Sequence, residues 1–104
     1  MIRLINSEIF ILGMGISGIS LAKYLIKKKI PVTCWDDNPE KRKIAHSLKV
    51  KINNMTTETF KNCNYLVLSP GINHQKKRPH EAVKIAESLK IKIVTDLEFL
   101  KILN

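Results

Sequence analysis

Three glycines in the stretch ILGMGISG constrain the fold of this chain more than any other feature. They are Gly13, Gly15 and Gly18, spaced G-x-G-x-x-G, and they follow the apolar run IFIL at 9–12. An apolar-periodic segment continues from there to Leu25. This order predicts a buried strand, a tight turn and the start of a helix. At such a turn the backbone amides can approach a phosphate group.

Short apolar or alternating runs recur along the chain and separate segments with helical periodicity. Asn38 and Pro39 mark the cap and the first residue of a second helix, and Pro79 marks the first residue of a later one. A short helix is also predicted at 57–61. Strands that alternate with helices at this spacing predict a parallel sheet with right-handed crossovers. The expected fold is α/β, a Rossmann-like five-stranded parallel sheet with helices on both faces. The predicted strands are residues 9–12, 32–35, 49–52, 65–69 and 91–94.

The helical segments carry apolar stripes that need cover, which for the last segment could come from the sheet or from a missing domain. The last segment, TDLEFLKILN, predicts a helix capped by Asp96 with Glu98 in its first turn, and this capping role is favoured over acid/base chemistry for the two carboxylates. The expected stripes comprise Ile19, Ala22 and Ile26 beside Leu21 and Leu25; Ile44, Ala45 and Leu48; Ala82, Val83, Ala86 and Leu89; and Leu97, Leu100 and Ile102.

The charge and cysteine content narrow the functional classes. The chain of 104 residues carries a formal net charge of +9 at pH 7, but its lysines are scattered, which argues against nucleic acid and only indicates a surface that does not repel anions. No apolar run is long enough for a membrane helix.

Cys34 and Cys63 lack C-x-x-C spacing, which predicts reduced thiols in a cytoplasmic protein. The three histidines are His46, His74 and His80. They lack the spacing of zinc ligands and are interpreted as surface residues, so no metal site is expected.

The residues that follow the first strand are the first candidate site. Ligands of doubly wound sheets lie beyond the carboxyl ends of the strands. Gly15 would let the backbone approach a phosphate, the amides near Ile16 and Ser17 would face it, and Gly18 would let the helix pack closely on the sheet. The alternative is a purely structural glycine turn. Ser17 is not interpreted as a nucleophile because the spacing does not match G-x-S-x-G.

The residues after the second and fourth strands lie at the same predicted rim. Asp36 is expected to accept hydrogen bonds from the ribose or base of a nucleotide, and Asp37 is a second candidate for this role. The alternative is that Asp36 and Asp37 cap the next helix, a role for which Asn38 also competes. The adjacent negative charges argue against a 2′-phosphate, and so against NADP, unless Arg42 compensates for them. Ser69, Pro70 and Gly71 form a predicted turn beside the ligand.

Four stretches together resemble the N-terminal, UDP-binding domain of the Mur ligases: ILGMGISGISLAKYL, VTCWDDN, LVLSPGI and IKIVTDLEFL. The resemblance covers essentially all 104 residues. The ending DLEFL is the specific part, because NAD-binding domains share the glycine turn and the acid but not that ending. The resemblance is greatest to the members that use ATP to add D-glutamate to UDP-N-acetylmuramoyl-L-alanine in peptidoglycan synthesis. It implies that residues 1–95 bind the UDP moiety of that substrate.

The resemblance also implies roles for individual residues and for missing domains. Ile16 and Ser17 would meet the diphosphate, Asp36 and Asp37 would hold the uracil, and the turn at 69–71 would border the ligand. The sequence has no G-x-x-x-x-G-K-[ST] loop, which ATP-dependent ligation needs together with Mg²⁺. Residues 96–104 are therefore expected to lead toward an absent ATP-binding central domain, and the chain alone is expected to be inactive, with no cofactor of its own. ATP, Mg²⁺ and the central and C-terminal domains would belong to the full-length enzyme.

Two other classes of function remain open. The glycine turn and Asp36 also fit an NAD-binding regulatory or dehydrogenase domain, which would prefer NAD to a UDP compound. A nucleic-acid or partner-binding module would rely on the positive charge and would bind nucleic acid with a steep dependence on salt.

Overall fold

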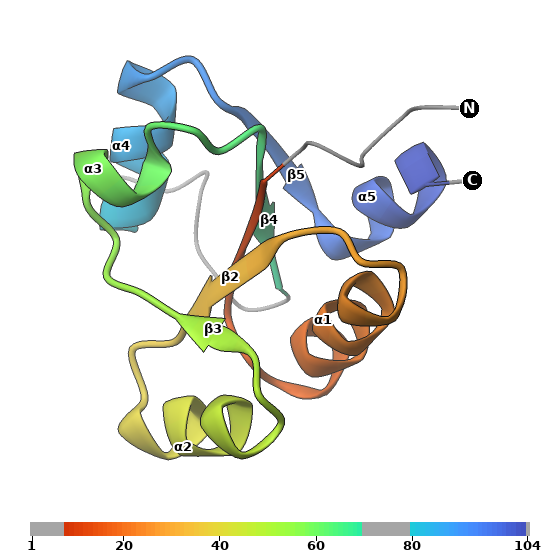
Figure 1. The fold of residues 1–104 in the computed structure, drawn as a ribbon. Helices are drawn as coiled ribbons and strands as arrows, with labels where there is room; N and C mark the ends of the chain where they lie inside the picture. Colours follow the sequence, from red (N-terminus) through yellow and green to blue (C-terminus); the bar gives the residue numbers. More distant parts are fainter. Residues whose placement is uncertain (1–7, 70–79, 104) are drawn as a thin grey trace.

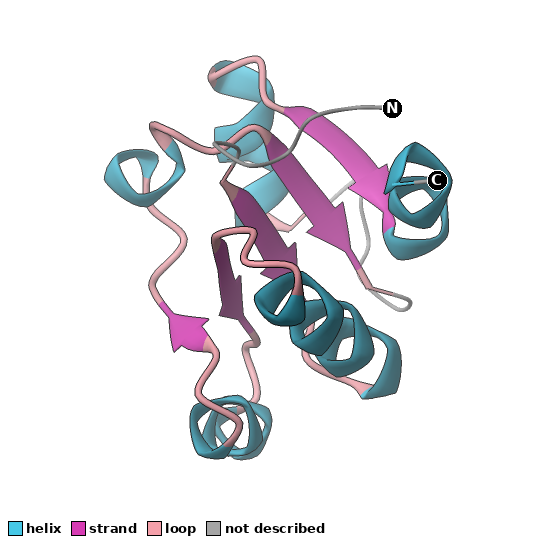
Figure 2. Ribbon diagram, turned by 45° about the vertical axis from the view of Figure 1, so that its right-hand side comes forward, coloured by secondary structure: helices cyan, strands magenta, loops and turns pink. Residues whose placement is uncertain are grey.

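The computed structural model describes residues 8–69 and 80–103. Figures 1 and 2 show that strands and helices alternate along this part of the chain. The strands are β1 (Ile9–Leu12), β2 (Val32–Trp35), β3 (Lys51–Ile52), β4 (Tyr65–Leu68) and β5 (Lys92–Thr95). The helices are α1 (Ile16–Lys27), α2 (Pro39–Ser47), α3 (Thr57–Phe60), α4 (Glu81–Ser88) and α5 (Asp96–Leu103).

Within the described residues, the strands form a five-stranded sheet in the order β3-β2-β1-β4-β5, and every pairing is parallel. Ile9 in the central strand pairs with Val32 on one side and with Tyr65 on the other. All four residues of β1 are buried, as expected for a parallel strand covered on both faces. The predicted α/β fold, with five parallel strands, is confirmed.

Two hydrophobic clusters lie on opposite faces of the sheet. Alternate residues of β1 enter different clusters, with Ile9 and Ile11 on the side of α1, α2 and α5, and Phe10 and Leu12 on the side of α3 and α4. Figure 1 shows α1 and α5 on the opposite side of the sheet from α3 and α4. Phe10 meets Phe60 edge to face, with ring centroids 4.6 Å apart. The carboxyl ends of the strands are therefore held between two packed layers.

Several element boundaries differ from the sequence prediction. β3 begins at Lys51 rather than at residue 49, and α4 begins at Glu81, with His80 as its N-cap, rather than at residue 79. Asp96 is the first residue of α5 and does not cap it. Instead, the Thr95 hydroxyl accepts from the Glu98 amide at 3.1 Å, and the Glu98 carboxylate accepts from the Thr95 amide at 2.7 Å. These two bonds form a capping box.

A lysine with a left-handed backbone follows the C-cap of three helices, α1, α2 and α4. Lys29, Lys49 and Lys90 have φ angles of 61°, 63° and 59°. After α1, the Lys29 amide donates to Ile26 and the Ile30 amide donates to Leu25, which is the Schellman pattern of hydrogen bonds. Glycine usually occupies this position because a left-handed conformation costs other residues about 1–2 kcal/mol. The conformation of Lys49 explains why β3 starts late.

The predicted apolar stripes are only partly buried. Leu21, Ala22 and Leu25 are buried on α1, but Ile26 is exposed. Ile44 and Leu89 are also exposed near the ends of their helices, and on α5 the residues Leu97 and Leu100 are exposed. Phe99, which the predicted stripe omitted, is fully buried on α5 and meets Tyr65 at 5.3 Å between ring centroids. No helix in the described part of the chain is long and apolar enough to span a membrane.

Candidate functional site

The glycine turn after β1 combines one left-handed residue with one close contact. Gly13 has a φ angle of 100°, which side chains rarely permit, and its amide donates to the Trp35 carbonyl at 2.8 Å. Gly18 is buried, and a Cβ atom on it would lie 2.1 Å from the Gly13 carbonyl oxygen and 2.8 Å from Ser69 Oγ. A Cβ atom on Gly15 would meet nothing within 4 Å. Gly18 therefore packs beneath the turn, whereas Gly15 faces open space.

The first turn of α1 differs from the first turns of the other helices. Gly15 is its N-cap and supplies no side-chain hydrogen bond. In the described helices α2 to α5, a side chain accepts from a first-turn amide, namely Asn38, Thr56, His80 and Thr95 respectively. The amides at the start of a helix have no partner within the helix and carry partial positive charge. The start of α1 is therefore suited to an anionic group.

Asp36 links the end of β2 to the glycine turn through a side-chain hydrogen bond. Its Oδ2 accepts from the Met14 amide at 2.7 Å, and its Oδ1 accepts from the Asn38 amide at 2.8 Å. Asn38, rather than Asp36, caps α2, because Asn38 Oδ1 accepts from the Glu40 amide at 2.9 Å. The predicted cap at Asn38 with Pro39 as the first helical residue is confirmed.

Asp37 follows Asp36 directly, and its carboxylate contacts two other side chains. Its Oδ1 accepts from Trp35 Nε1 at 3.0 Å, and its Oδ2 lies 2.6 Å from His80 Nε2. Partial burial works to raise the pKa of Asp37, but the hydrogen bonds from His80 and then Trp35 outweigh it and lower this pKa below its ordinary value. The side chain of His80 is only 16% exposed, so its interpretation as a surface residue is wrong.

Ser69 joins the end of β4 to the same turn. Its side chain is buried, and its hydroxyl donates to the Gly13 carbonyl at 2.8 Å. Pro70 and Gly71 of the predicted turn lie outside the described residues, as do His74 and the basic residues 76–78.

A cavity of about 570 Å³ opens where these strand ends meet. The structure brings five of the predicted site residues to its lining from three separate parts of the sequence: Gly15, Ile16, Ser17, Asp36 and Ser69. Gly13 and Lys41 complete the lining, while the predicted residues Gly18 and Asp37 are not part of it. Sequence reasoning missed Lys41. The sequence did contain a signal for it. Lys41 is a cation in the first turn of the helix after Asp36, and that turn lies at the sheet edge where ligands of this fold bind.

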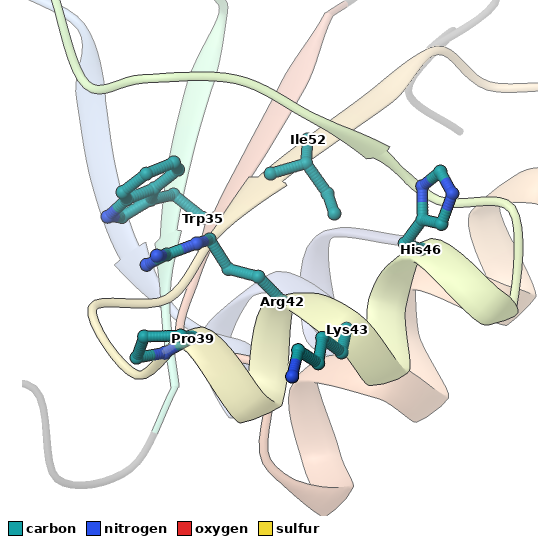
Figure 3. Close-up of a pocket in the computed structure, with 6 residues that line it drawn as sticks. All are labelled: Trp35, Pro39, Arg42, Lys43, His46 and Ile52. Carbon is teal, nitrogen blue, oxygen red and sulfur yellow. The ribbon is translucent and has the colours of Figure 1, made fainter.

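A second cavity of about 440 Å³ lies over α2 and the end of β2 (Figure 3). Figure 3 shows the Arg42 guanidinium alongside the Trp35 ring, and the guanidinium carbon lies 4.4 Å from the ring centroid. Arg42 Nη1 also donates to the Asp36 carbonyl at 2.7 Å. The Lys43 ammonium lies 3.4 Å from Glu40 Oε1 at an exposed position. Arg42 thus links the Trp35 ring to the Asp36 backbone through one stacking contact and one hydrogen bond.

Both thiols are free; Cys34 is buried and Cys63 is partly buried. Burial, and to a smaller extent the charge of Asp36, raises the pKa of Cys34 to about 12. Burial also raises the pKa of Cys63 to about 11, although its hydrogen bond to the Tyr65 carbonyl at 2.9 Å opposes the shift. Among the described residues, no cluster of three or more His, Cys, Asp or Glu side chains could hold a metal ion.

The raised thiol pKa values predict slow alkylation of the folded chain. Only the thiolate reacts, so at pH 8 we expect iodoacetamide to modify Cys34 and Cys63 at least about 100-fold more slowly than it modifies the same thiols in urea. The rates should rise as the pH approaches the raised pKa values. Timed mass spectrometry of the intact chain measures both rates. Fast labelling of the folded chain at pH 8 would contradict the shielding of the thiols.

The comparisons with known proteins identify the family of this chain. The model of the family described as "Mur ligase MurD-like, N-terminal domain" matches residues 7–95. The chain therefore belongs to the MurD-like N-terminal domains of the Mur ligases, and the recognition made from the sequence is confirmed.

Curated relatives carry the name of one ligase. The UDP-N-acetylmuramoylalanine–D-glutamate ligase of Bartonella henselae is 32% identical over 93 residues, which cover 89% of this chain and 20% of the relative. The ligase of the same name from Wolbachia sp. subsp. Brugia malayi is 30% identical over 95 residues, covering 89% of this chain and 19% of the relative. The chain spans about a fifth of the length of these relatives.

Solved structures share the fold without close sequence similarity. A shikimate dehydrogenase from Aquifex aeolicus matches with a TM-score of 0.68 at 18% identity, covering 94% of this chain and 45% of the dehydrogenase. An imine reductase from Pseudomonas sp. matches with a TM-score of 0.59 at 21% identity, covering 91% of this chain and 36% of the reductase. At such identities the likeness shows the Rossmann-like fold alone.

Proposed function

We propose that this chain binds the UDP moiety of UDP-N-acetylmuramoyl-L-alanine and forms the N-terminal part of a ligase that adds D-glutamate. One observation carries the proposal. In a member of the MurD-like family, the uncapped start of α1 opens into the same cavity as Asp36 and Ser69. The names of the curated relatives support this substrate class.

The cavity offers complementary chemistry for a uridine diphosphate. The amides of Ile16 and Ser17 and the cation of Lys41 would meet the diphosphate, and the open side of Gly15 leaves room for it. Asp36 would accept from uracil N3, whose flanking carbonyls need donors such as backbone amides. Ser69 would border the ligand, together with Pro70 and Gly71 of the turn. Gly18 would contribute by packing closely beneath the turn, and Asp37 would help to hold the uracil.

The remaining chemistry belongs to other parts of the enzyme. ATP, with Mg²⁺, would phosphorylate the alanine carboxylate of the substrate and release ADP. The D-glutamate amine would then attack the acyl carbon, forming the amide and releasing phosphate and a proton. In this proposal residues 1–95 anchor the nucleotide end, and residues 96–104 lead toward the ATP-binding domain. The 104 residues alone are expected to produce no ADP, and the free thiols fit a cytoplasmic location.

An NMR titration of the isotope-labelled chain tests the function. UDP-N-acetylmuramoyl-L-alanine should shift the amides of residues 13–18, 36–38 and Ser69, while NAD at matched ionic strength should leave them in place. Shifts with NAD and none with the UDP compound would favour a dinucleotide-binding domain instead, which the glycine turn and Asp36 also permit. Shifts that spread over all the lysine-rich surfaces and vanish in salt would indicate nonspecific anion binding.

Lys41 is expected to contribute to diphosphate binding through its charge. Lys41→Gln should weaken binding of the UDP compound by about tenfold, because a charge-assisted contact to a phosphate is lost. Lys43→Gln is the matched control, since Lys43 loses the same charge two residues away but faces the other cavity beside Glu40. Isothermal titration calorimetry at two salt concentrations measures both. Equal effects of the two variants would show that only the net charge matters.

A further inference from the structure

A network of hydrogen bonds and one cation–π contact runs from the start of α4 to the glycine turn. His80 contacts Asp37, and Asp37 accepts from Trp35. The Trp35 ring stacks on Arg42, whose Nη1 donates to the Asp36 carbonyl, and the Asp36 carboxylate accepts from the Met14 amide. The network therefore connects α4, on one face of the sheet, to the turn before α1, on the other. His80 and Asp37 do not line the cavity of about 570 Å³ themselves.

The hydrogen bonds of His80 define the role of each ring nitrogen. The Ala82 amide donates to Nδ1 at 3.1 Å, so Nδ1 bears no proton in this arrangement. The other nitrogen, Nε2, therefore carries the ring proton and donates it to Asp37 Oδ2 at 2.6 Å. One nitrogen caps α4, and the other holds the carboxylate that follows β2.

We propose that His80 is a positioning residue for the nucleotide site and acts through Asp37. By fixing the Asp37 carboxylate, His80 holds the turn at 36–38, and this keeps the adjacent Asp36 carboxylate on the Met14 amide. The nucleotide then meets an acid and a glycine turn that are already aligned, so less conformational freedom is lost on binding. This inference rests on the proposed function, because it assigns the effect to the UDP site.

Two conservative variants separate the two nitrogens of His80. His80→Asn retains an acceptor near the Nδ1 position, and asparagine is among the best N-caps, but it cannot reach Asp37 as Nε2 does. His80→Gln carries an amide donor near the Nε2 position but lacks a short-range cap. Thr56→Ala is the matched control for loss of a cap, because Thr56 caps α3 with no link to Asp37.

The binding measurement uses UDP-N-acetylmuramoyl-L-alanine with the 104-residue chain and its variants. We expect His80→Asn to weaken binding by about threefold to tenfold, as for the loss of one net hydrogen bond, and His80→Gln to bind nearly as tightly as the wild type. Thr56→Ala should lower thermal stability without a change in affinity. Wild-type affinity in His80→Asn would overturn the proposal. Weakening in His80→Gln that equals or exceeds that in His80→Asn would also overturn it, because retaining the donor to Asp37 would then not preserve binding.

A ligand-free measurement distinguishes this inference from the proposed function. Trp35 is the one tryptophan of the chain, so its indole N–H gives a single NMR resonance. That resonance and the Met14 amide should both shift in His80→Asn and much less in His80→Gln. An unchanged Met14 amide in His80→Asn would overturn the positioning role whatever the ligand does. If the wild type fails to bind the UDP compound, the proposed function fails, while the Met14 amide still decides whether His80 positions the turn.

Discussion

Gly18→Ala is expected to lower the free energy of unfolding by about 2 kcal/mol or more. Alanine would gain about 1 kcal/mol in helix propensity, but its Cβ would lie 2.1 Å from the Gly13 carbonyl oxygen. That atom belongs to the backbone of a turn whose Gly13 amide is also bonded to the Trp35 carbonyl, so it cannot move aside cheaply. Overpacking of this kind costs about 1–3 kcal/mol, and more where backbone must shift.

Urea unfolding followed by circular dichroism measures the effect. Gly15→Ala is the control, because a Cβ there meets nothing within 4 Å and the residue's φ of −77° suits alanine. We expect Gly15→Ala to remain within about 1 kcal/mol of the wild type, the usual range for a changed N-cap. Its methyl group would project toward the cavity, so its affinity for the UDP compound should fall. Equal stability of the two variants would contradict the close packing at Gly18.

Asp36→Ala is expected to reduce both stability and ligand binding. The variant leaves the amide of Met14, a fully buried residue, without its acceptor, and it also removes the acceptor of the Asn38 amide. An unsatisfied buried donor costs about 1–3 kcal/mol, so the melting temperature should fall by roughly 10 °C for a domain of this size. The affinity for the UDP compound should fall by about tenfold or more, measured at a temperature where the variant is folded.

Glu87→Gln is the control for Asp36→Ala, because Glu87 is an exposed acid on α4 and its loss changes the net charge equally. It should leave the melting temperature and the affinity unchanged. Asp36→Asn should fall between Asp36→Ala and the wild type, since one amide oxygen can replace only one of the two acceptors. A wild-type melting temperature for Asp36→Ala would show that the Met14 amide finds another acceptor.

The sheet was predictable because its signals are local. The glycine spacing fixes the β1–α1 turn, and Asn38 with Pro39 fixes the start of α2. The strand ends of a parallel sheet share one edge, so the meeting of Gly15, Asp36 and Ser69 at one cavity followed from the order of the elements. Fold and cavity thus required no knowledge of side-chain contacts.

The missed features depend on contacts between distant residues or on unusual backbone. Nothing near His80 in the sequence indicates that its ring would reach Asp37 across the sheet edge. The late start of β3 depends on a lysine in a conformation that usually selects glycine, at Lys49. Thr95 is not evident as a cap from the sequence, because it is also the last residue of β5 and the next residue, Asp96, is of a type that is preferred over threonine as an N-cap.

The central position of β1 has a consequence for how the chain folds. Ile9 can pair with Val32 soon after α1 forms, but its second partner, Tyr65, comes much later in the sequence. Forming that distant pairing requires closure of a long loop, which slows folding. Until residues 65–68 arrive, a wholly apolar strand keeps one open edge. During synthesis this unpaired apolar edge can pair with other chains, which is a route to aggregation.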